Sequence, residues 1–313
     1  MRLRDVTLRD GLQDTAPIGL DAKLSIFDSL LAAGVADFEV TSFARPDRVP
    51  ALADAEAFAT EAISRNGAAV LWGLVLNARG AQRALSCGIQ NVQFVLSISE
   101  AHNANNAGRS VDESLAELAD IVTIARDGAA DLEVTLATAF GCPYDGPVDP
   151  DAVVGVAKRV SDLGVRRISL ADTIGTAIPD EVESLVARVR DEFAFYELGV
   201  HLHDTRGLAI ANALAAMRAG ATRLDGTVGG LGGCPFAPGA SGNLVLEDLV
   251  HVLEASGVDT GIDLPLLIEA SALTCDITGH AQASHVAVAR PRFERRFESS
   301  VSAGNEMAPH VVG

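Results

Sequence analysis

The stretch Asp21–Thr41, DAKLSIFDSLLAAGVADFEVT, decides the fold class. Its first part places Leu24 and Phe27 at the spacing of one helical face. Gly34 then ends the helix, because glycine readily adopts the left-handed conformation that follows many helix C-termini. The residues Asp37–Thr41 continue as a short strand. A helix, a glycine and a strand therefore follow one another as a unit.

The same unit returns along the chain. The junction of helix, glycine and strand appears again at Leu163-Gly164-Val165 and Ala219-Gly220-Ala221. Strands are expected at Asp5–Leu8, Asp37–Thr41, Val70–Leu76, Asn91–Ser97, Glu133–Ala139, Arg167–Leu170, Gly199–His203 and Arg223–Val228. Helical patterns are expected at Asp21–Ala33, Leu52–Arg65, Ala78–Cys87, Val111–Arg126, Pro150–Leu163, Pro179–Glu192, Leu208–Ala219 and Leu246–Ser256.

Eight alternations of strand and helix predict an α/β fold, a (β/α)8 TIM barrel. A doubly wound open sheet is the alternative. We expect a catalytic barrel domain over residues 1–280, which ends with an extra helix at Leu264–Gly279. Residues 281–313 form a C-terminal extension that we expect to be partly mobile. Its basic cluster, Arg290–Arg296, fits either contact with phosphate or a solvated tail.

The composition is that of a globular protein with an excess of acidic residues. The 313 residues are 48% hydrophobic and 21% charged, and the formal net charge is −18 at pH 7. Nucleic acids and anionic membranes bind basic faces, so this charge argues against both as main partners. The four cysteines form no C-x-x-C pair, no apolar run reaches about 18 residues, and we expect no signal peptide. We therefore expect a cytoplasmic protein with a small-molecule substrate.

Polar and charged residues gather where the predicted strands end. In such barrels the active site lies at the carboxyl ends of the strands, which together form the barrel mouth. The residues expected there are Arg9, Asp10, Glu39, Asp172, His201 and His203. Burying such groups is costly unless they are used or satisfied, so the clustering predicts an active site. The alternative is a network of polar side chains that bond only to one another.

Two histidines of this group, His201 and His203, are separated by a single residue. Side chains alternate along a strand, so both rings point to the same face. With the carboxylate of Asp10 and the amide oxygen of Asn243 they offer a site for magnesium or manganese, and also for zinc or iron. Arg9 is placed to neutralise charge on a substrate whose carbon–carbon bond breaks beside a carbonyl. The alternative is a histidine pair that bonds to backbone groups at the strand end.

A glycine-rich loop follows the last predicted strand. Gly229–Gly242 holds six glycines in fourteen residues and carries Cys234 near its middle. Such a loop lets backbone approach a ligand, and a thiol on a mobile lid can move a proton. A phosphate-cradling loop and a merely flexible surface loop are the alternatives. The pattern G-x-x-x-x-G-K-[ST] is absent, which excludes a P-loop.

Together, these segments resemble the 3-hydroxy-3-methylglutaryl-CoA (HMG-CoA) lyase branch of the metal-dependent, DRE-type lyase and synthase barrels. That wider group includes isopropylmalate and homocitrate synthases. The matching segments follow the family order from residue 5 to about residue 290. They are Thr7–Gln13 (TLRDGLQ), Thr41–Phe43 (TSF), Gly141–Tyr144 (GCPY), Ile168–Gly175 (ISLADTIG), His201–Thr205 (HLHDT) and Gly230–Leu244.

The resemblance implies a role for each residue at the mouth. A divalent metal, Mg²⁺ or Mn²⁺, would be held by Asp10, His201, His203 and Asn243. The implied catalytic residues are Arg9, which would stabilise an enolate, Cys234, which would be the general acid/base, and Glu39 and Asp172. The implied substrate-binding residues are Arg9, Gln13 and His201. The implied reaction is retro-aldol or retro-Claisen cleavage of an HMG-CoA-like substrate to acetyl-CoA and acetoacetate, as in leucine degradation.

Positions that would meet the acyl end of the substrate or the CoA depart from the lyase pattern. Asp14-Thr15-Ala16-Pro17 stands where the lyases have an acidic residue and lysine, and Pro46-Asp47 stands where they have Pro-Lys. Glu133-Val134-Thr135 replaces Arg-Gly-Tyr, and Arg206 replaces a tyrosine. A related hydroxyacyl-CoA, a hydroxy acid without CoA, and a Claisen-type synthase that joins an acyl-CoA to a 2-oxo acid therefore stay open. A metal- or acyl-binding barrel without catalysis is a further alternative. The resemblance also implies a homodimer.

Overall fold

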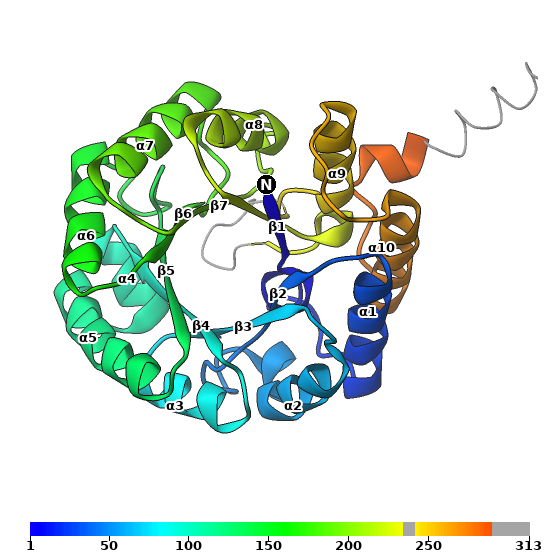
Figure 1. Ribbon diagram of the computed structural model, residues 1–313, viewed down its shortest axis with the longest axis horizontal. Coiled ribbons are helices and arrows are strands. Elements are labelled where there is room, and N and C mark those ends of the chain that lie inside the picture. The colour runs from blue at the N-terminus through cyan, green and yellow to red at the C-terminus, as the bar shows by residue number, and fades with distance from the viewer. Residues whose placement is uncertain (234–241, 290–313) are drawn as a thin grey trace, which may run out of the picture.

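The protein is a closed barrel of eight parallel strands (Figure 1). The computed structural model describes residues 1–233 and 242–289. Each strand pairs with the next along the chain, and β8 returns to pair with β1. The strands are β1 (Arg2–Asp5), β2 (Asp37–Ser42), β3 (Val70–Val75), β4 (Asn91–Ser97), β5 (Asp131–Ala137), β6 (Arg167–Asp172), β7 (Glu197–Leu202) and β8 (Arg223–Gly226). This closure confirms the TIM barrel and excludes the doubly wound open sheet.

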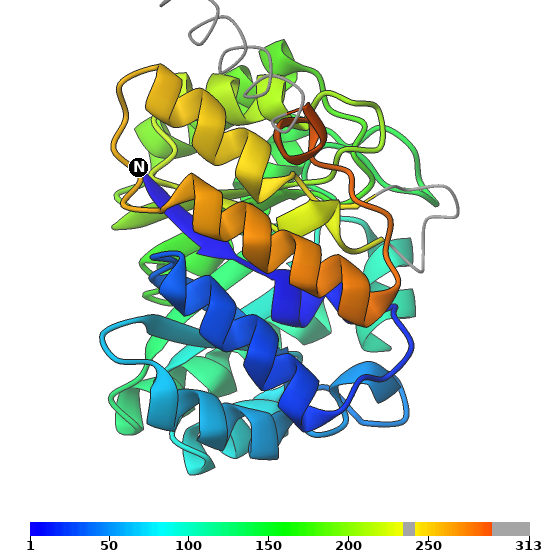
Figure 2. The same cartoon turned by 90° about the vertical axis from the view of Figure 1, so that its right-hand side faces the viewer.

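Helices surround the barrel, and most lie where the sequence pattern predicts them. They are α1 (Leu20–Ala32), α2 (Ala55–Arg65), α3 (Ala78–Ser86), α4 (Glu100–Ala107), α5 (Val111–Asp127), α6 (Pro150–Asp162), α7 (Pro179–Glu192), α8 (Ala209–Ala219), α9 (Leu246–Ala255) and α10 (Leu264–Thr278). The pattern does not predict α4, which begins where the Ser99 hydroxyl accepts a hydrogen bond from the amide of His102 at 3.0 Å. α10 is the predicted extra helix, and it packs beside α1 on the outside of the barrel (Figure 2).

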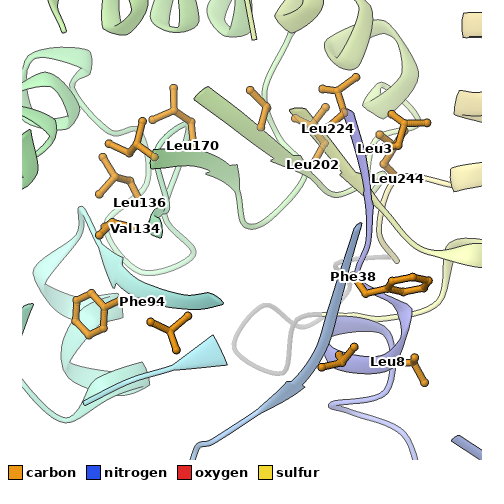
Figure 3. Packing of buried hydrophobic residues seen from close by; sticks show 14 of the residues in the cluster. Leu3, Leu8, Phe38, Phe94, Val134, Leu136, Leu170, Leu202, Leu224 and Leu244 are labelled. Atoms are coloured by element: carbon orange, nitrogen blue, oxygen red, sulfur yellow. The ribbon is translucent and has the colours of Figure 1, made fainter. Parts of the chain in front are cut away.

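Successive residues of each strand face two different environments. On β5, Val134 and Leu136 lie in the apolar layer between the strands and the helices, as Phe94 does on β4 (Figure 3). Glu133 points the other way, and its Oε1 accepts a hydrogen bond from Arg4 of β1 at 3.1 Å. β1 and β5 are not neighbours in the sheet, so this bond crosses the barrel interior. The interior is therefore charged, whereas the layer beneath the helices is apolar.

The first strand is shorter than expected and lies earlier in the sequence. A strand was expected over Asp5–Leu8, but β1 ends at the first residue of that range, and Thr7–Gly11 forms a short turn of π-helix, η1. The three successive amides of residues 9–11 donate to the carbonyl oxygen of Val6 at 2.8–3.2 Å. The alternating pattern does not reveal this convergence on one carbonyl. This turn, rather than a strand, presents Arg9 and Asp10 to the barrel mouth.

Three expectations, two of them about the end of the chain, stay predictions. α10 ends at Thr278, and the described residues continue to residue 289, so the boundary at residue 280 is not tested. The cluster Arg290–Arg296 lies outside the described residues. The homodimer likewise stays a prediction. Among the helices of the described residues, none is long and apolar enough to cross a membrane.

Candidate active site

Three side chains from distant parts of the sequence meet at the barrel mouth. Asp10 comes from η1, His201 from β7, and His203 from the position just after β7. The Oδ2 atom of Asp10 lies 3.8 Å from Nε2 of His201 and 3.6 Å from Nε2 of His203. One ligand atom from each residue lies within 4.8 Å of the others, and all three residues are buried. The fold therefore brings the predicted cluster together.

Asn243 joins this group from the far side of the glycine loop. It forms an isolated β-bridge with His203, and its Nδ2 atom donates to Oδ2 of Asp10 at 2.6 Å. Two buried atoms, Nε2 of His203 and Oδ1 of Asn243, have no hydrogen-bond partner among the described residues. Unpartnered buried acceptors of this kind suit a cation. Two imidazole nitrogens, a carboxylate and an amide oxygen together form a possible metal site.

The backbone sets the orientation of the His203 ring. Its Nδ1 atom lies 3.1 Å from the carbonyl oxygen of Asp172. A carbonyl oxygen only accepts, so Nδ1 carries the proton and Nε2 is left free to bind a cation. Burial alone would lower the pKa of His203, but the neighbouring Asp10 carboxylate outweighs it and the net shift is upward. Protons and a metal therefore compete for this ring.

Asp10 is held as a carboxylate. Burial alone would raise the pKa of Asp10, but the charge of Arg9 and the contacts with His203 and His201 outweigh it, and the pKa lies below its usual range. Its Oδ1 atom accepts hydrogen bonds from Arg9 and from Nε2 of Gln13, the latter at 2.9 Å. Its Oδ2 atom faces the two histidines and Asn243. The two oxygens are thus divided between anchoring and a cation.

Arg9 lies beside this group between two carboxylates. One guanidinium nitrogen bonds to Asp10, and the other donates to Oε2 of Glu39 at 2.8 Å. Burial would lower the pKa of Arg9, but Asp10 and Glu39 outweigh it, so the guanidinium stays charged. Its Nε atom is buried and has no hydrogen-bond partner among the described residues. Arg9 is therefore a cation in a fixed position, and its Nε–H is available to donate a hydrogen bond to a ligand.

Asp172 lies near the group but turns its carboxylate away from it. Its two carboxylate oxygens accept hydrogen bonds from the amides of Thr176 and Ala177, each at 3.0 Å. Asp172 therefore stabilises the turn after β6, and its carbonyl orients His203. This is a structural role, different from the catalytic one that the resemblance implies. A direct catalytic role for Asp172 stays a prediction.

The described part of the glycine loop passes close to Asn243. Gly232 has a φ of +114°, and a Cβ atom placed there would lie 2.5 Å from Nδ2 of Asn243. Glycine is the residue that satisfies both conditions, a positive φ and a close approach. Cys234, the predicted general acid/base, lies outside the described residues, so its position and role stay predictions.

Comparisons with known proteins identify the family. Residues 1–274 match the family model described as HMGL-like. The chain belongs to the HMGL-like family. It is 40% identical over 278 residues to the (R)-citramalyl-CoA lyase of Chloroflexus aurantiacus, with 85% of this chain and 87% of that protein covered. It is 37% identical over 270 residues to the hydroxymethylglutaryl-CoA lyase YngG of Bacillus subtilis, with 86% and 90% covered.

Solved structures agree with this family assignment. An HMG-CoA lyase of Acinetobacter baumannii, solved with coenzyme A and 3-methylmalate, superposes with a TM-score of 0.87 at 36% sequence identity. The match covers 100% of this chain and 97% of that one. These relatives are carbon–carbon lyases, and so is this HMGL-like chain.

Two inner-face residues of this HMGL-like barrel escaped the sequence analysis. With its amide oriented to satisfy both neighbours, Gln93 donates to Oε1 of Glu39 at 2.9 Å and accepts from the Thr135 hydroxyl at 2.5 Å. Asp225 of β8 places Oδ2 3.4 Å from Nδ1 of His201. The alternation of side chains along β4 and β8 could have identified them from the sequence, because it places Gln93 and Asp225 on the inner face of the barrel.

Proposed function

We propose that this HMGL-like lyase cleaves a 3-hydroxyacyl-CoA that carries a methyl group on the hydroxyl carbon and a terminal carboxylate. HMG-CoA is the first candidate, and its cleavage gives acetyl-CoA and acetoacetate. One observation supports the proposal above the others. The buried ligand group of Asp10, His201 and His203 has the Arg9 guanidinium directly beside it.

The residues of this group would hold the divalent metal. Asp10, His201, His203 and Asn243 offer donors that suit Mg²⁺ or Mn²⁺, which are the cofactors we propose. When bound, the metal would supply a positive charge that polarises the substrate hydroxyl and a neighbouring carbonyl or carboxylate oxygen. Gln13 contributes by holding Oδ1 of Asp10, which leaves Oδ2 facing the histidines.

The proposed cleavage is redox-neutral. A base takes the proton of the tertiary hydroxyl, and the bond between C2 and C3 of the acyl chain breaks. The hydroxyl carbon becomes the ketone of the oxo acid, and the electron pair of the broken bond stays on C2 as the enolate of acetyl-CoA. A proton delivered to C2 then completes acetyl-CoA.

Arg9 is the residue proposed to stabilise that enolate. It is charged, 9% exposed at its side chain and fixed by Asp10 and Glu39, so it loses little orientational freedom when charge develops nearby. Its unpartnered Nε–H is a free donor. Cys234 is proposed to give C2 its proton from the glycine loop. The resemblance of the glycine loop to that of the lyases supports that assignment.

A second substrate, (R)-citramalyl-CoA, is favoured by a specific observation. The relative from Chloroflexus aurantiacus, at 40% identity, is named for this substrate. Citramalyl-CoA is one methylene shorter than HMG-CoA, and the same bond cleavage would give acetyl-CoA and pyruvate. Pockets discriminate such neighbours by only about 10–200-fold. Both thioesters therefore belong in the same experiment.

The test is to incubate the purified protein with each thioester and Mg²⁺ or Mn²⁺, and to follow the products by mass spectrometry. We expect acetyl-CoA with acetoacetate or with pyruvate. Cleavage of the free hydroxy acids alone would favour the substrate without CoA. Release of free CoA from acetyl-CoA and a 2-oxo acid would favour the synthase. Binding of every thioester without cleavage would contradict the proposal and favour a binding barrel.

A further inference from the structure

The two histidines of the ligand group are oriented by different means. Nδ1 of His203 faces a backbone carbonyl, that of Asp172, at 3.1 Å. Nδ1 of His201 faces a side chain, with Oδ2 of Asp225 at 3.4 Å. His201 and Asp225 are register partners on β7 and β8, so both side chains enter the barrel at the same level. Asp225 is 1% exposed and was assigned no role from the sequence.

Asp225 is itself fixed by an arginine of its own strand. Nε of Arg223 donates to Oδ1 of Asp225 at 2.8 Å, and a second guanidinium nitrogen lies 3.4 Å from Oδ2. Arg223 also bonds to Glu133 and, at 2.9 Å, to Oε1 of Glu197. Each of these four side chains is at most 6% exposed. The carboxylate that faces His201 therefore belongs to a buried ionic network and lies at the end of that network nearest the barrel mouth.

The neighbouring strand leaves room for this arrangement. A Cβ atom placed on Gly199 of β7 would lie 2.4 Å from a guanidinium nitrogen of Arg223. A larger residue there would push the guanidinium away from its carboxylates. Gly199 precedes His201 by two positions, so it lies directly beneath the ring on the same inner face. One strand thus provides both the ligand and the space for the residue that anchors its partner.

The contacts of the other carboxylates show that Asp225 has a separate task. Glu133 of β5 and Glu197 of β7 already neutralise Arg223 and Arg4. Asp37 contacts Arg4 and Arg2 and no ligand of the metal site. Among the described carboxylates of this network, Asp225 alone has an oxygen facing a histidine of the ligand group.

We propose that Asp225 is a positioning residue for His201, and that Arg223 holds it in place. Asp225 would keep the proton of His201 on Nδ1 and the lone pair on Nε2, which faces the cation site. A carboxylate behind a histidine also makes the ring a stronger ligand, and loss of such a partner typically weakens metal binding about 10–100-fold. This inference rests on the metal site of the proposed function.

The test measures Mn²⁺ affinity without substrate, by the electron paramagnetic resonance signal of free Mn²⁺. We expect Asp225→Ala to weaken binding about 10–100-fold. The Mn²⁺ affinity of Asp225→Asn should lie between those of the wild type and Asp225→Ala. Its amide oxygen can still accept a hydrogen bond from Nδ1–H of His201 but carries no charge. Arg223→Met should also weaken binding, by releasing Asp225. The matched control is Asp37→Asn, a buried carboxylate of the same network, which should leave the affinity within about twofold.

Two readouts keep the inference separate from folding and from the proposed function. If Asp225→Ala does not fold, NMR of ¹⁵N-histidine in the wild type still decides, because His201 must be protonated at Nδ1. Unchanged Mn²⁺ affinity in folded Asp225→Ala, or an unprotonated Nδ1, would overturn the role of Asp225. If the wild type binds no Mn²⁺ and His203→Ala changes nothing, the metal site itself is wrong, and this inference is overturned with it.

Discussion

The two faces of the strand barrel are built from opposite chemistry. On the outer face, Val134 and Leu136 are buried against the helices in a continuous apolar layer. On the inner face, Glu133 pairs with Arg4 and Arg223, and the same network continues upward to Asp225. Adjacent residues of a single strand thus perform different tasks. The outer layer holds the barrel together, and the inner network fixes the groups at its mouth.

Glu133 on the inner face also differs from two buried acids outside the barrel interior, Asp5 and Glu247. On the inner face burial would raise the pKa of Glu133, but Arg223 and Arg4 outweigh it and the net shift is downward. On the outer face, burial raises the pKa of Asp5 and of Glu247 to about 7. Neither of these two carboxyls forms an ion pair with a cationic side chain of the described residues. Glu133 is therefore compensated inside the barrel, whereas Asp5 and Glu247 are left uncompensated beneath the helices.

The largest expected effect comes from a substitution in the ligand group at the barrel mouth. Asp10→Asn removes the charge that faces both histidines, so Mn²⁺ binding should be lost and kcat/KM should fall about 10³-fold or more. Equilibrium binding and steady-state kinetics measure the two losses. A chelator should abolish wild-type activity, and added Mg²⁺ or Mn²⁺ should restore it. Full activity of Asp10→Asn would show that the inner face does not serve the chemistry.

Cys234→Ser is expected to have the next largest effect. A serine hydroxyl is a much poorer acid than a thiol, so kcat should fall about 10²-fold or more if Cys234 delivers the proton to C2. Mn²⁺ affinity and thermal stability should stay unchanged, because the thiol is not one of the proposed ligands. Cys87→Ser, on the outside of the barrel beyond α3, is the matched control and should leave kcat unchanged. Unchanged turnover in Cys234→Ser would remove the thiol from the mechanism.

These two faces also separate what the sequence reveals from what it conceals. The recurrence of helix, glycine and strand predicts the barrel, and alternation along β7 predicts that His201 and His203 share a face. The inner network is not predictable in this way, because Arg4 and Glu133 are 129 positions apart and each resembles a surface charge in its local sequence. The π-helical turn that carries Arg9 and Asp10 depends on one carbonyl accepting from three amides. Local periodicity contains neither signal.

A cavity in the apolar layer of the outer face should lower the stability of the protein but leave its activity unchanged. Leu136→Ala leaves a cavity beneath the helices and should lower the free energy of unfolding by about 2–5 kcal/mol. The kcat of the folded variant should stay close to wild type, because Leu136 faces away from the mouth. Urea denaturation and steady-state kinetics at low temperature measure the two quantities. A loss of kcat as large as the loss of stability would show that the two faces are not independent.

The smallest expected effect concerns the uncompensated acid Glu247. Its pKa rises to about 7 in the folded protein, because burial opposes the charge, while in the unfolded chain it stays near 4.5. As pH rises from 4.5 towards 7 the unfolded chain loses its proton first, so the free energy of unfolding falls, by about 2–3 kcal/mol. Glu247→Gln cannot ionise, and its amide oxygen can still accept from the amide of Gly229.

The variant should therefore match the wild type near pH 4.5 and exceed it in stability above pH 7, as measured by urea denaturation at both pH values. Glu61→Gln is the matched control, because its side chain is 49% exposed, and it should leave the pH dependence unchanged. If the free energy of unfolding depended on pH equally in Glu247→Gln and in the wild type, Glu247 would already be ionised and would have a compensating partner. The outer face would then resemble the inner one, and the contrast between them would be one of hydrophobicity alone.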